Sequence, residues 1–233
     1  MTEPVVAAQT YAHWRATTLG NITERVETDV VFDLAGPLRG KRVLDVGTGD
    51  GTYAIEAAQR GAAVTALDLE QEMLDAARAR AASRGVEVTL QQGRAEQLPF
   101  ADASFDVVIA VTVLCFVPDA QRAVGEMARV LAPGGRVILG ELGRFSVWAA
   151  ERRVRGWLGA STWRRAQFWS RRELVALAQG AGLHAASVHG AVFFPPSGVA
   201  ARLMAPVEPL LTRLHAPGAA FLALAAYKRE FPS

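Results

Sequence analysis

Cysteine is almost absent from this 233-residue sequence, which contains only Cys115. A single cysteine excludes an intramolecular disulfide and a metal site built from several thiolates, and it fits a reducing environment. Histidine is also scarce, and the spacing of the four present is not that of a metal-ligand set; they are His13, His184, His189 and His215. We therefore expect no metal and a cytoplasmic location.

Long apolar runs and an excess of charge of one sign are missing as well. No run reaches the roughly 18 apolar residues that a membrane-spanning helix needs, and Glu3, His13 and Arg15 interrupt the first 20 residues. We expect neither a signal peptide nor a membrane span. The formal net charge is only +2, which provides no overall basic field, so nucleic acid is not an expected partner.

What the sequence does contain is a strand that runs into a glycine-rich turn, Val-Leu-Asp-Val-Gly-Thr-Gly-Asp-Gly at residues 43–51. Gly47, Gly49 and Gly51 permit positive φ angles or the close approach of a ligand. The helix predicted to follow would present free N–H groups and the positive end of its dipole. The carboxylate of Asp45 suits a cationic ligand better than a phosphate. The pattern predicts a ligand site against this turn.

Strands and helices alternate around the turn. Apolar residues make up 51% of the sequence, which is enough for the core of one α/β domain. Strand 105–111 is apolar on both faces, as in parallel strands buried between helix layers, so we expect a doubly wound sheet. The predicted strands are 42–47, 63–68, 87–92, 105–111, 135–142, 183–189 and 220–228, and the predicted helices are 5–17, 23–34, 52–60, 70–84, 119–131, 170–180 and a broken helix over 199–214, with a short turn or helix at 95–98.

Four further segments, 63–68, 93–100, 105–110 and 129–136, follow the turn in an order that resembles the class I S-adenosylmethionine (SAM)-dependent methyltransferases. The turn itself resembles motif I of that family. The resemblance covers roughly residues 40–142. It implies a Rossmann-like, doubly wound seven-stranded sheet, mostly parallel with the last strand antiparallel, and helical lid segments at both ends. The single domain would comprise an N-terminal helical cover (1–36), a SAM-binding core (40–142), and a lid with the completing strands (143–233).

The resemblance also implies SAM as the cofactor and assigns residues to it. Asp68 ends the second strand, where a carboxylate can accept hydrogen bonds from both ribose hydroxyls; capping the next helix is the alternative role. Leu69 and Met73 would flank the adenine, although core packing is an equally open role for Met73. The full set of expected cofactor contacts is Asp45, Gly47, Thr48, Gly49, Gly51, Asp68, Leu69, Met73, Arg94, Ala95, Glu96, Val111 and Thr112.

Arg94 departs from the family, which usually has an acidic residue at this place to read the adenine amino group. Arginine cannot accept that hydrogen bond. Either Glu96 or a backbone carbonyl replaces the missing acceptor, or Arg94 points away and only the Ala95 amide contacts the base. At Val111 and Thr112 the family offers a backbone carbonyl to the methionine ammonium.

The resemblance leaves the catalytic residues unknown; Tyr11, His13 and Cys115 are the candidates. A lone cysteine in an apolar run is more often a buried small hydrophobe. Transfer from a sulfonium requires mainly positioning and desolvation, so we expect no covalent catalysis.

The expected function is methyl transfer to a small or lipophilic acceptor, as in the group that includes ubiquinone and menaquinone biosynthesis enzymes. Two alternatives stay open. One is an NAD-dependent oxidoreductase, although Thr52 stands where the dinucleotide fingerprint has glycine or alanine. The other is a non-catalytic SAM-binding protein. The oligomeric state has no signal in the sequence.

Residues 144–172 combine four of the five tryptophans with eight arginines. This segment has three interpretations: an amphipathic helix packed on the core, a site for an anionic substrate, or a peripheral membrane contact. We expect the packed helix, with Val147, Val154 and Leu158 on its buried side.

Overall fold

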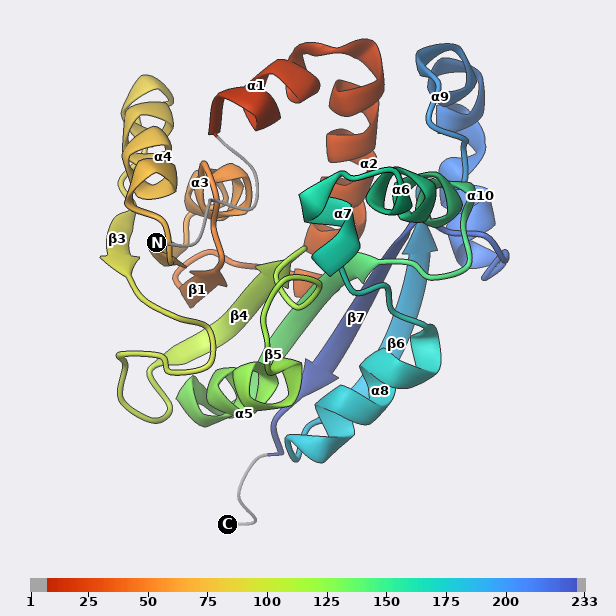
Figure 1. Ribbon diagram of the computed structural model, residues 1–233. Coiled ribbons are helices and arrows are strands. Elements are labelled where there is room, and N and C mark those ends of the chain that lie inside the picture. Colours follow the sequence, from red (N-terminus) through yellow and green to blue (C-terminus); the bar gives the residue numbers. More distant parts are fainter. Residues whose placement is uncertain (1–7, 230–233) are drawn as a thin grey trace.

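The computed structural model describes residues 8–229, which fold around one seven-stranded sheet (Figure 1). The strand order is β3-β2-β1-β4-β5-β7-β6, and β7 runs antiparallel to both of its neighbours. This confirms the mostly parallel sheet with an antiparallel last strand. The strands are β1 (Arg42–Val46), β2 (Ala63–Asp68), β3 (Thr89–Gln92), β4 (Phe105–Val111), β5 (Leu131–Leu142), β6 (His184–Ala191) and β7 (Phe221–Tyr227).

Helices cover both faces of this sheet. Figure 1 shows α5 and α8 on one face and α2 and α3 on the other, which is the layering of a doubly wound fold. Among the described residues, every helix is too short or too polar to cross a lipid bilayer. The helices are α1 (Ala8–Ala16), α2 (Thr18–Ala35), α3 (Thr52–Gln59), α4 (Gln71–Ser83), α5 (Ala120–Val130), α6 (Val147–Trp157), α7 (Ser161–Arg165), α8 (Arg171–Gly180), α9 (Gly198–Met204), the 3-10 helix η1 (Ala205–Val207) and α10 (Glu208–Arg213).

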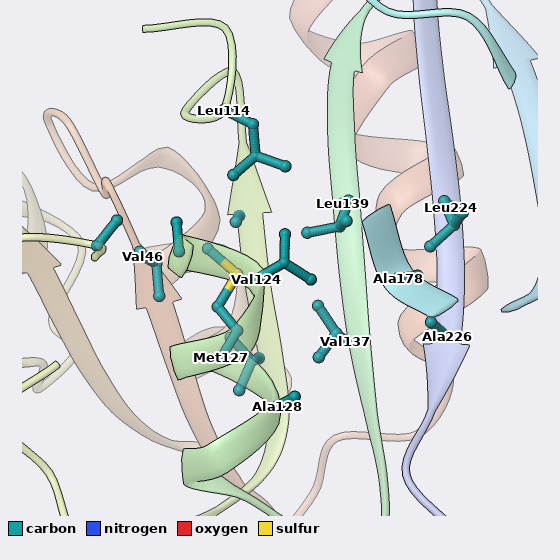
Figure 2. Packing of buried hydrophobic residues seen from close by; sticks show 14 of the residues in the cluster. Val46, Leu114, Val124, Met127, Ala128, Val137, Leu139, Ala178, Leu224 and Ala226 are labelled. Atoms are coloured by element: carbon teal, nitrogen blue, oxygen red, sulfur yellow. The ribbon is translucent and has the colours of Figure 1, made fainter. Parts of the chain in front are cut away.

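The α5 side of the sheet shows why this layer is stable. Val124 and Met127 of α5 lie against Val137 and Leu139 of β5 (Figure 2), and all four side chains are fully buried. The three- and four-residue spacing of the apolar positions on α5 places them on one face of the helix. Its polar side chains are left on the outer face.

The N-terminal helices begin differently from the prediction. Helix α2 starts at Thr18 rather than at residue 23, because the Thr17 hydroxyl accepts a hydrogen bond of 3.0 Å from the Gly20 amide. Gly20 also lets the corner close, since a Cβ there would overlap the backbone of Trp14. Residues 5–7 of the predicted first helix lie outside the described residues. Residues 95–98 form a turn and no helix.

The expected orientation of α6 is wrong. Val147, Val154 and Leu158 are 62%, 52% and 79% exposed, so the predicted core-facing stripe points outward. The buried face instead carries Trp148, whose indole N–H donates to the Phe194 carbonyl at 2.7 Å. A tryptophan with a satisfied N–H buries far more area than a valine, and this decides which side faces inward.

We predict that Met127→Ala destabilises the fold by about 2–5 kcal/mol, because it leaves a cavity between α5 and the sheet. Urea denaturation followed by circular dichroism measures this change. Leu203→Ala is the matched control, since Leu203 is 75% exposed and its truncation should have little effect. Equal losses in the two variants would contradict the packing described for α5.

Candidate functional site

The glycine turn is fastened to the carboxyl end of β2. The amides of Gly47 and Thr48 both donate to the Leu67 carbonyl, at 2.7 and 2.9 Å. The Gly49 amide donates to the Asp68 carboxylate at 2.8 Å. The turn between β1 and α3 is therefore held beside the last residue of the neighbouring strand.

The three glycines of the turn have different roles, although all have positive φ angles. A Cβ at Gly47 would overlap the Val113 side chain, and a Cβ at Gly51 would lie 3.1 Å from that of Ala77. A Cβ at Gly49 would meet nothing within 4 Å. Gly47 and Gly51 thus permit close packing within the protein, whereas a side chain at Gly49 would point into open space.

That space is a pocket of about 290 Å³ at the carboxyl ends of β1, β2 and β4. All the predicted cofactor contacts line it except Asp45 and Gly51. The structure thus brings together residues from four separate stretches of the chain, as expected at the switch point of such a sheet. Further lining residues that the sequence did not indicate are Asp50, Thr52, Tyr53, Leu67, Glu70, Gly93, Val113, Val117 and Pro118.

Asp68 is held by two backbone amides within the protein. One carboxylate oxygen accepts from Gly49, and the other accepts from the Glu70 amide at 3.0 Å, just before α4. A carboxylate offers about four lone-pair sites, so each oxygen keeps acceptor capacity. The side chain lines the pocket beside the space that Gly49 leaves open. Its acceptor oxygens suit a ligand with neighbouring hydroxyls, such as a ribose, and disfavour a phosphate.

Asp45 lies beneath the turn and is 1% exposed. Its carboxylate accepts a 2.7 Å hydrogen bond from the Thr48 hydroxyl. Burial raises the pKa of Asp45 to about 7, and the hydrogen bond from Thr48 opposes this rise in part. Thr48, rather than Asp45, lines the pocket, so the carboxylate fixes the turn from below.

Arg94 and Glu96 both line the opposite wall of the pocket. The Arg94 side chain is 56% exposed, whereas that of Glu96 is 14% exposed, and the two approach to 4.0 Å. Because an arginine side chain can only donate hydrogen bonds, Glu96 is the acceptor of this pair, and it is also the more buried of the two.

The three catalytic candidates lie in different surroundings. Tyr11 lines the pocket, whereas His13 is exposed and does not. Cys115 is buried behind the wall, and its thiol donates to the Thr112 carbonyl at 3.3 Å. Burial, with a further contribution from the charge of Glu141, raises the pKa of this thiol well above its usual value. Among the described residues, no three His, Cys, Asp or Glu side chains form a group that could hold a metal.

Glu141 was missed by the sequence interpretation and shapes the pocket wall. It is fully buried at the end of β5, and it accepts hydrogen bonds from the amides of Val113, Leu114 and Cys115 at 3.2, 2.8 and 3.2 Å. Burial raises the pKa of Glu141 to about 8, against the opposing effect of these amides. The carboxyl thus holds the turn after β4. A glutamate inside the apolar strand 135–142 was the available signal.

An ionic network holds α1 over the glycine turn. Arg15 of α1 forms an ion pair with the buried Asp50, and Arg80 of α4 reaches the same carboxylate at 2.6 Å. Thr52 accepts from Arg15 at 3.1 Å and donates to Glu24 of α2 at 2.8 Å. Helices α1, α2 and α4 therefore meet at the start of α3, which encloses the pocket from above.

Several known proteins that this chain resembles are methyltransferases. A family model described as a methyltransferase domain matches residues 44–139. A ubiquinone biosynthesis O-methyltransferase of Idiomarina loihiensis is 36% identical over 171 residues, which is 69% of each chain. An uncharacterised protein of Mycobacterium tuberculosis is 44% identical over 108 residues, or 46% of this chain, and the match spans 39% of that relative's length.

The fold has solved counterparts as well. The crystal structure of a SAM-dependent methyltransferase from Thermotoga maritima, described as a possible histamine N-methyltransferase, is similar with a TM-score of 0.73. It is 26% identical in sequence, and the match covers 95% of both chains.

The raised pKa of Glu141 predicts a pH-dependent stability. The carboxyl titrates near 4.5 in the unfolded chain and near 8 in the fold, so its contribution is fully present below pH 4.5 and is lost as the pH rises to about 8. We expect the free energy of unfolding of the unmodified protein, relative to Glu141→Gln, to fall between about pH 5 and 9. Urea denaturation at both ends of this range measures it.

Glu126→Gln is the control for this titration, because hydrogen bonds from Arg129 lower the pKa of Glu126. The Glu126 carboxyl is charged in both the folded and the unfolded protein above about pH 5. The difference in free energy of unfolding between the unmodified protein and Glu126→Gln should therefore stay constant above that pH. If the difference in free energy of unfolding between the unmodified protein and Glu141→Gln stayed constant over the same range, Glu141 would not be a buried, protonated carboxyl.

Proposed function

This chain belongs to the class I SAM-dependent methyltransferases, and we propose that it transfers a methyl group from SAM to a small or lipophilic acceptor. The observation that carries the proposal is the pocket in which Gly49 borders open space beside the acceptor oxygens of Asp68. The name of the Idiomarina relative, an O-methyltransferase, supports an oxygen acceptor.

In the proposed binding mode, Asp68 accepts hydrogen bonds from both ribose hydroxyls while it keeps its bonds to the turn. Leu69 and Met73 flank the adenine, and the Ala95 amide and the Glu96 carboxylate contact its edge. These residues form one end of the pocket. Arg94, with its exposed side chain, leaves the acceptor role to Glu96.

The other end of the pocket would hold the methionine portion. The carbonyls of Val111 and Thr112 can accept from its ammonium group, and Thr112 has the positive φ of 54° that turns the chain after β4. Gly47, Gly51 and Asp45 would act from behind, by letting the turn pack and by fixing its Thr48.

The chemistry requires little of the side chains beyond placement. When bound, SAM supplies a methyl group that its sulfonium has already activated. Tyr11, Tyr53, Phe116 and Pro118 line the pocket and would exclude water from the transfer path. Residues 1–36 and 143–233 would supply the cover and the acceptor wall, and 40–142 the cofactor site.

A transfer assay tests the proposed function. The full chain is incubated with methyl-labelled SAM and with hydroxyl, amine and thiol acceptors, and mass spectrometry follows the labelled product and S-adenosylhomocysteine. Acceptor-dependent formation of both supports the proposal. SAM binding without transfer to any acceptor would favour the non-catalytic alternative.

Asp68→Ala should raise the dissociation constant for SAM at least tenfold and leave the protein folded. Losing a charged acceptor costs about 1.5–3 kcal/mol per hydrogen bond. Asp68→Asn should have a smaller effect, because it keeps one acceptor oxygen. Calorimetric titration measures the affinity, and circular dichroism checks the fold.

Asp75→Ala is the matched control, since Asp75 is an exposed carboxylate on α4 away from the pocket. Normal affinity in a folded Asp68→Ala protein would mean that the cofactor site is elsewhere. Unfolding of Asp68→Ala with full rescue by Asp68→Asn would leave Asp68 only its role in holding the turn.

A further inference from the structure

We propose that Glu27 of α2 and Arg152 of α6 form the acceptor site, which takes an aromatic hydroxyl compound: Arg152 binds the oxygen that becomes methylated, and Glu27 receives its proton. This inference rests on the proposed function and adds the chemical class of the acceptor. The sequence did not indicate Glu27, and it indicated Arg152 only as one of the arginines of residues 144–172, for which a site for an anionic substrate was one of three interpretations.

Glu27 lies on the inward face of α2. It stands four residues after Thr23 and four before Val31, both buried, so the three side chains share one side of the helix. Glu27 is itself only partly buried. Loss of hydration is nevertheless the main cause that raises the pKa of Glu27 to about 8. A carboxyl that protein surrounds but solvent still reaches lines an interior space.

Neither Glu27 nor its neighbour Thr23 is satisfied within the protein. Among residues 8–229, no hydrogen bond or ion pair within 4.0 Å reaches the Glu27 carboxyl. The Thr23 hydroxyl is buried and also has no hydrogen-bond partner among residues 8–229. Buried polar groups are nearly always paired, so the unpaired Thr23 hydroxyl, one turn from the Glu27 carboxyl, indicates a polar ligand at this place.

Arg152 faces the same interior from α6. Its guanidinium lies over the rings of Trp148 and Trp163, at 5.0 and 4.7 Å from their centroids. No carboxylate within 4.0 Å and no hydrogen-bond acceptor contacts it among the described residues. The two arginines beside it have outward partners, since Arg153 donates to the Arg144 carbonyl and Arg155 pairs with Glu151.

Packing places Glu27 next to residues that line the pocket, whereas Glu27 and Arg152 themselves lie outside its lining. On α2, Glu24 binds Thr52 at 2.8 Å, and the Phe32 ring lies 6.3 Å from that of Tyr53, so Glu27 between them faces the start of α3. Both Thr52 and Tyr53 line the pocket.

On the other side, α6 packs against the turn after β4. Ala149, one turn before Arg152 on the buried face, lies in one apolar cluster with Cys115, next to the pocket-lining Phe116. The two charges also interact electrostatically, because Arg152 lowers the pKa of Glu27 in part. The carboxyl and the guanidinium therefore interact without closing into an ion pair.

This arrangement selects an acidic hydroxyl over an amine. Arg152 would attract a phenolate oxygen and repel an ammonium group. Phe116, which lines the pocket, provides a flat apolar surface that suits an aromatic ring. Burial raises the pKa of Glu27 to about 8, which is closer to that of a phenolic hydroxyl than an ordinary carboxyl is and favours proton transfer from the hydroxyl to the carboxylate.

The step balances without any further reactant. The hydroxyl proton passes to the Glu27 carboxylate as the acceptor oxygen bonds to the methyl carbon. The bond between that carbon and sulfur breaks, sulfur keeps the electron pair, and S-adenosylhomocysteine leaves as the neutral thioether. Glu27 then releases the proton to water.

The test uses 4-nitrocatechol, whose absorbance distinguishes phenol from phenolate. Bound to the unmodified protein with S-adenosylhomocysteine, the probe should show an apparent pKa lower than in water by about one unit or more. Arg152→Met should abolish this shift, and Arg152→Lys should keep part of it. Arg155→Met, which removes an outward-facing charge, is the matched control.

Transfer kinetics test Glu27 separately. Glu27→Gln should lower kcat for methyl transfer to unsubstituted catechol, whose hydroxyls keep their protons at neutral pH, by about 100-fold and leave the affinity for SAM within about threefold. Asp33→Asn, an exposed carboxylate on the same helix, is the control and should keep the full rate.

An unchanged probe spectrum in Arg152→Met, full activity in Glu27→Gln, or transfer to benzylamine but not to the catechol would overturn the inference. If the unmodified protein transfers a methyl group to none of the acceptors, this contradicts the proposed function instead. The shift in the probe spectrum then still decides whether the two charges bind the hydroxyl compound.

Discussion

The carbonyl of Leu67 is the contact on which the site depends. It accepts the amides of Gly47 and Thr48, while the next residue, Asp68, accepts that of Gly49. These bonds join the glycine turn to the neighbouring strand and leave Gly49 beside open space. Because β2 is a central parallel strand, the pocket inherits the rigidity of the sheet, and a ligand meets a surface already formed.

Around this rigid end, buried carboxyls set the shape of the remaining walls. Asp45 fixes the turn from below, Glu141 holds the turn after β4, and Asp50 joins α1 and α4 above the pocket. Each would be costly if unpaired, and each is satisfied by hydrogen bonds or a cation. Glu27 and Arg152 are the contrast, since both face the interior without such partners. That difference separates the structural charges from those available to an acceptor.

Sequence patterns predicted the parts of the structure that depend on local signals. Strand–helix alternation and the glycine turn indicated the sheet, and Asp68 followed from its place at a strand end. The orientation of α6 could not be predicted from local signals, because Trp148 faces inward through a hydrogen bond to the Phe194 carbonyl, which is far along the chain. The electrostatic interaction of Glu27 with Arg152 was equally hidden, since 125 positions separate two ordinary charged residues on helices. Only the tertiary fold brings α2 and α6 close enough for the two charges to interact.

The central claim is that this pocket is built for SAM and not for a dinucleotide. Calorimetric titration of the full chain with SAM and, separately, with NAD tests it most directly. Both ligands carry a ribose diol that Asp68 could bind, but the glycine turn would face the methionine portion of SAM or the pyrophosphate of NAD. The account predicts saturable binding of SAM at one site per chain and no heat from NAD. Binding of NAD with none of SAM would contradict it.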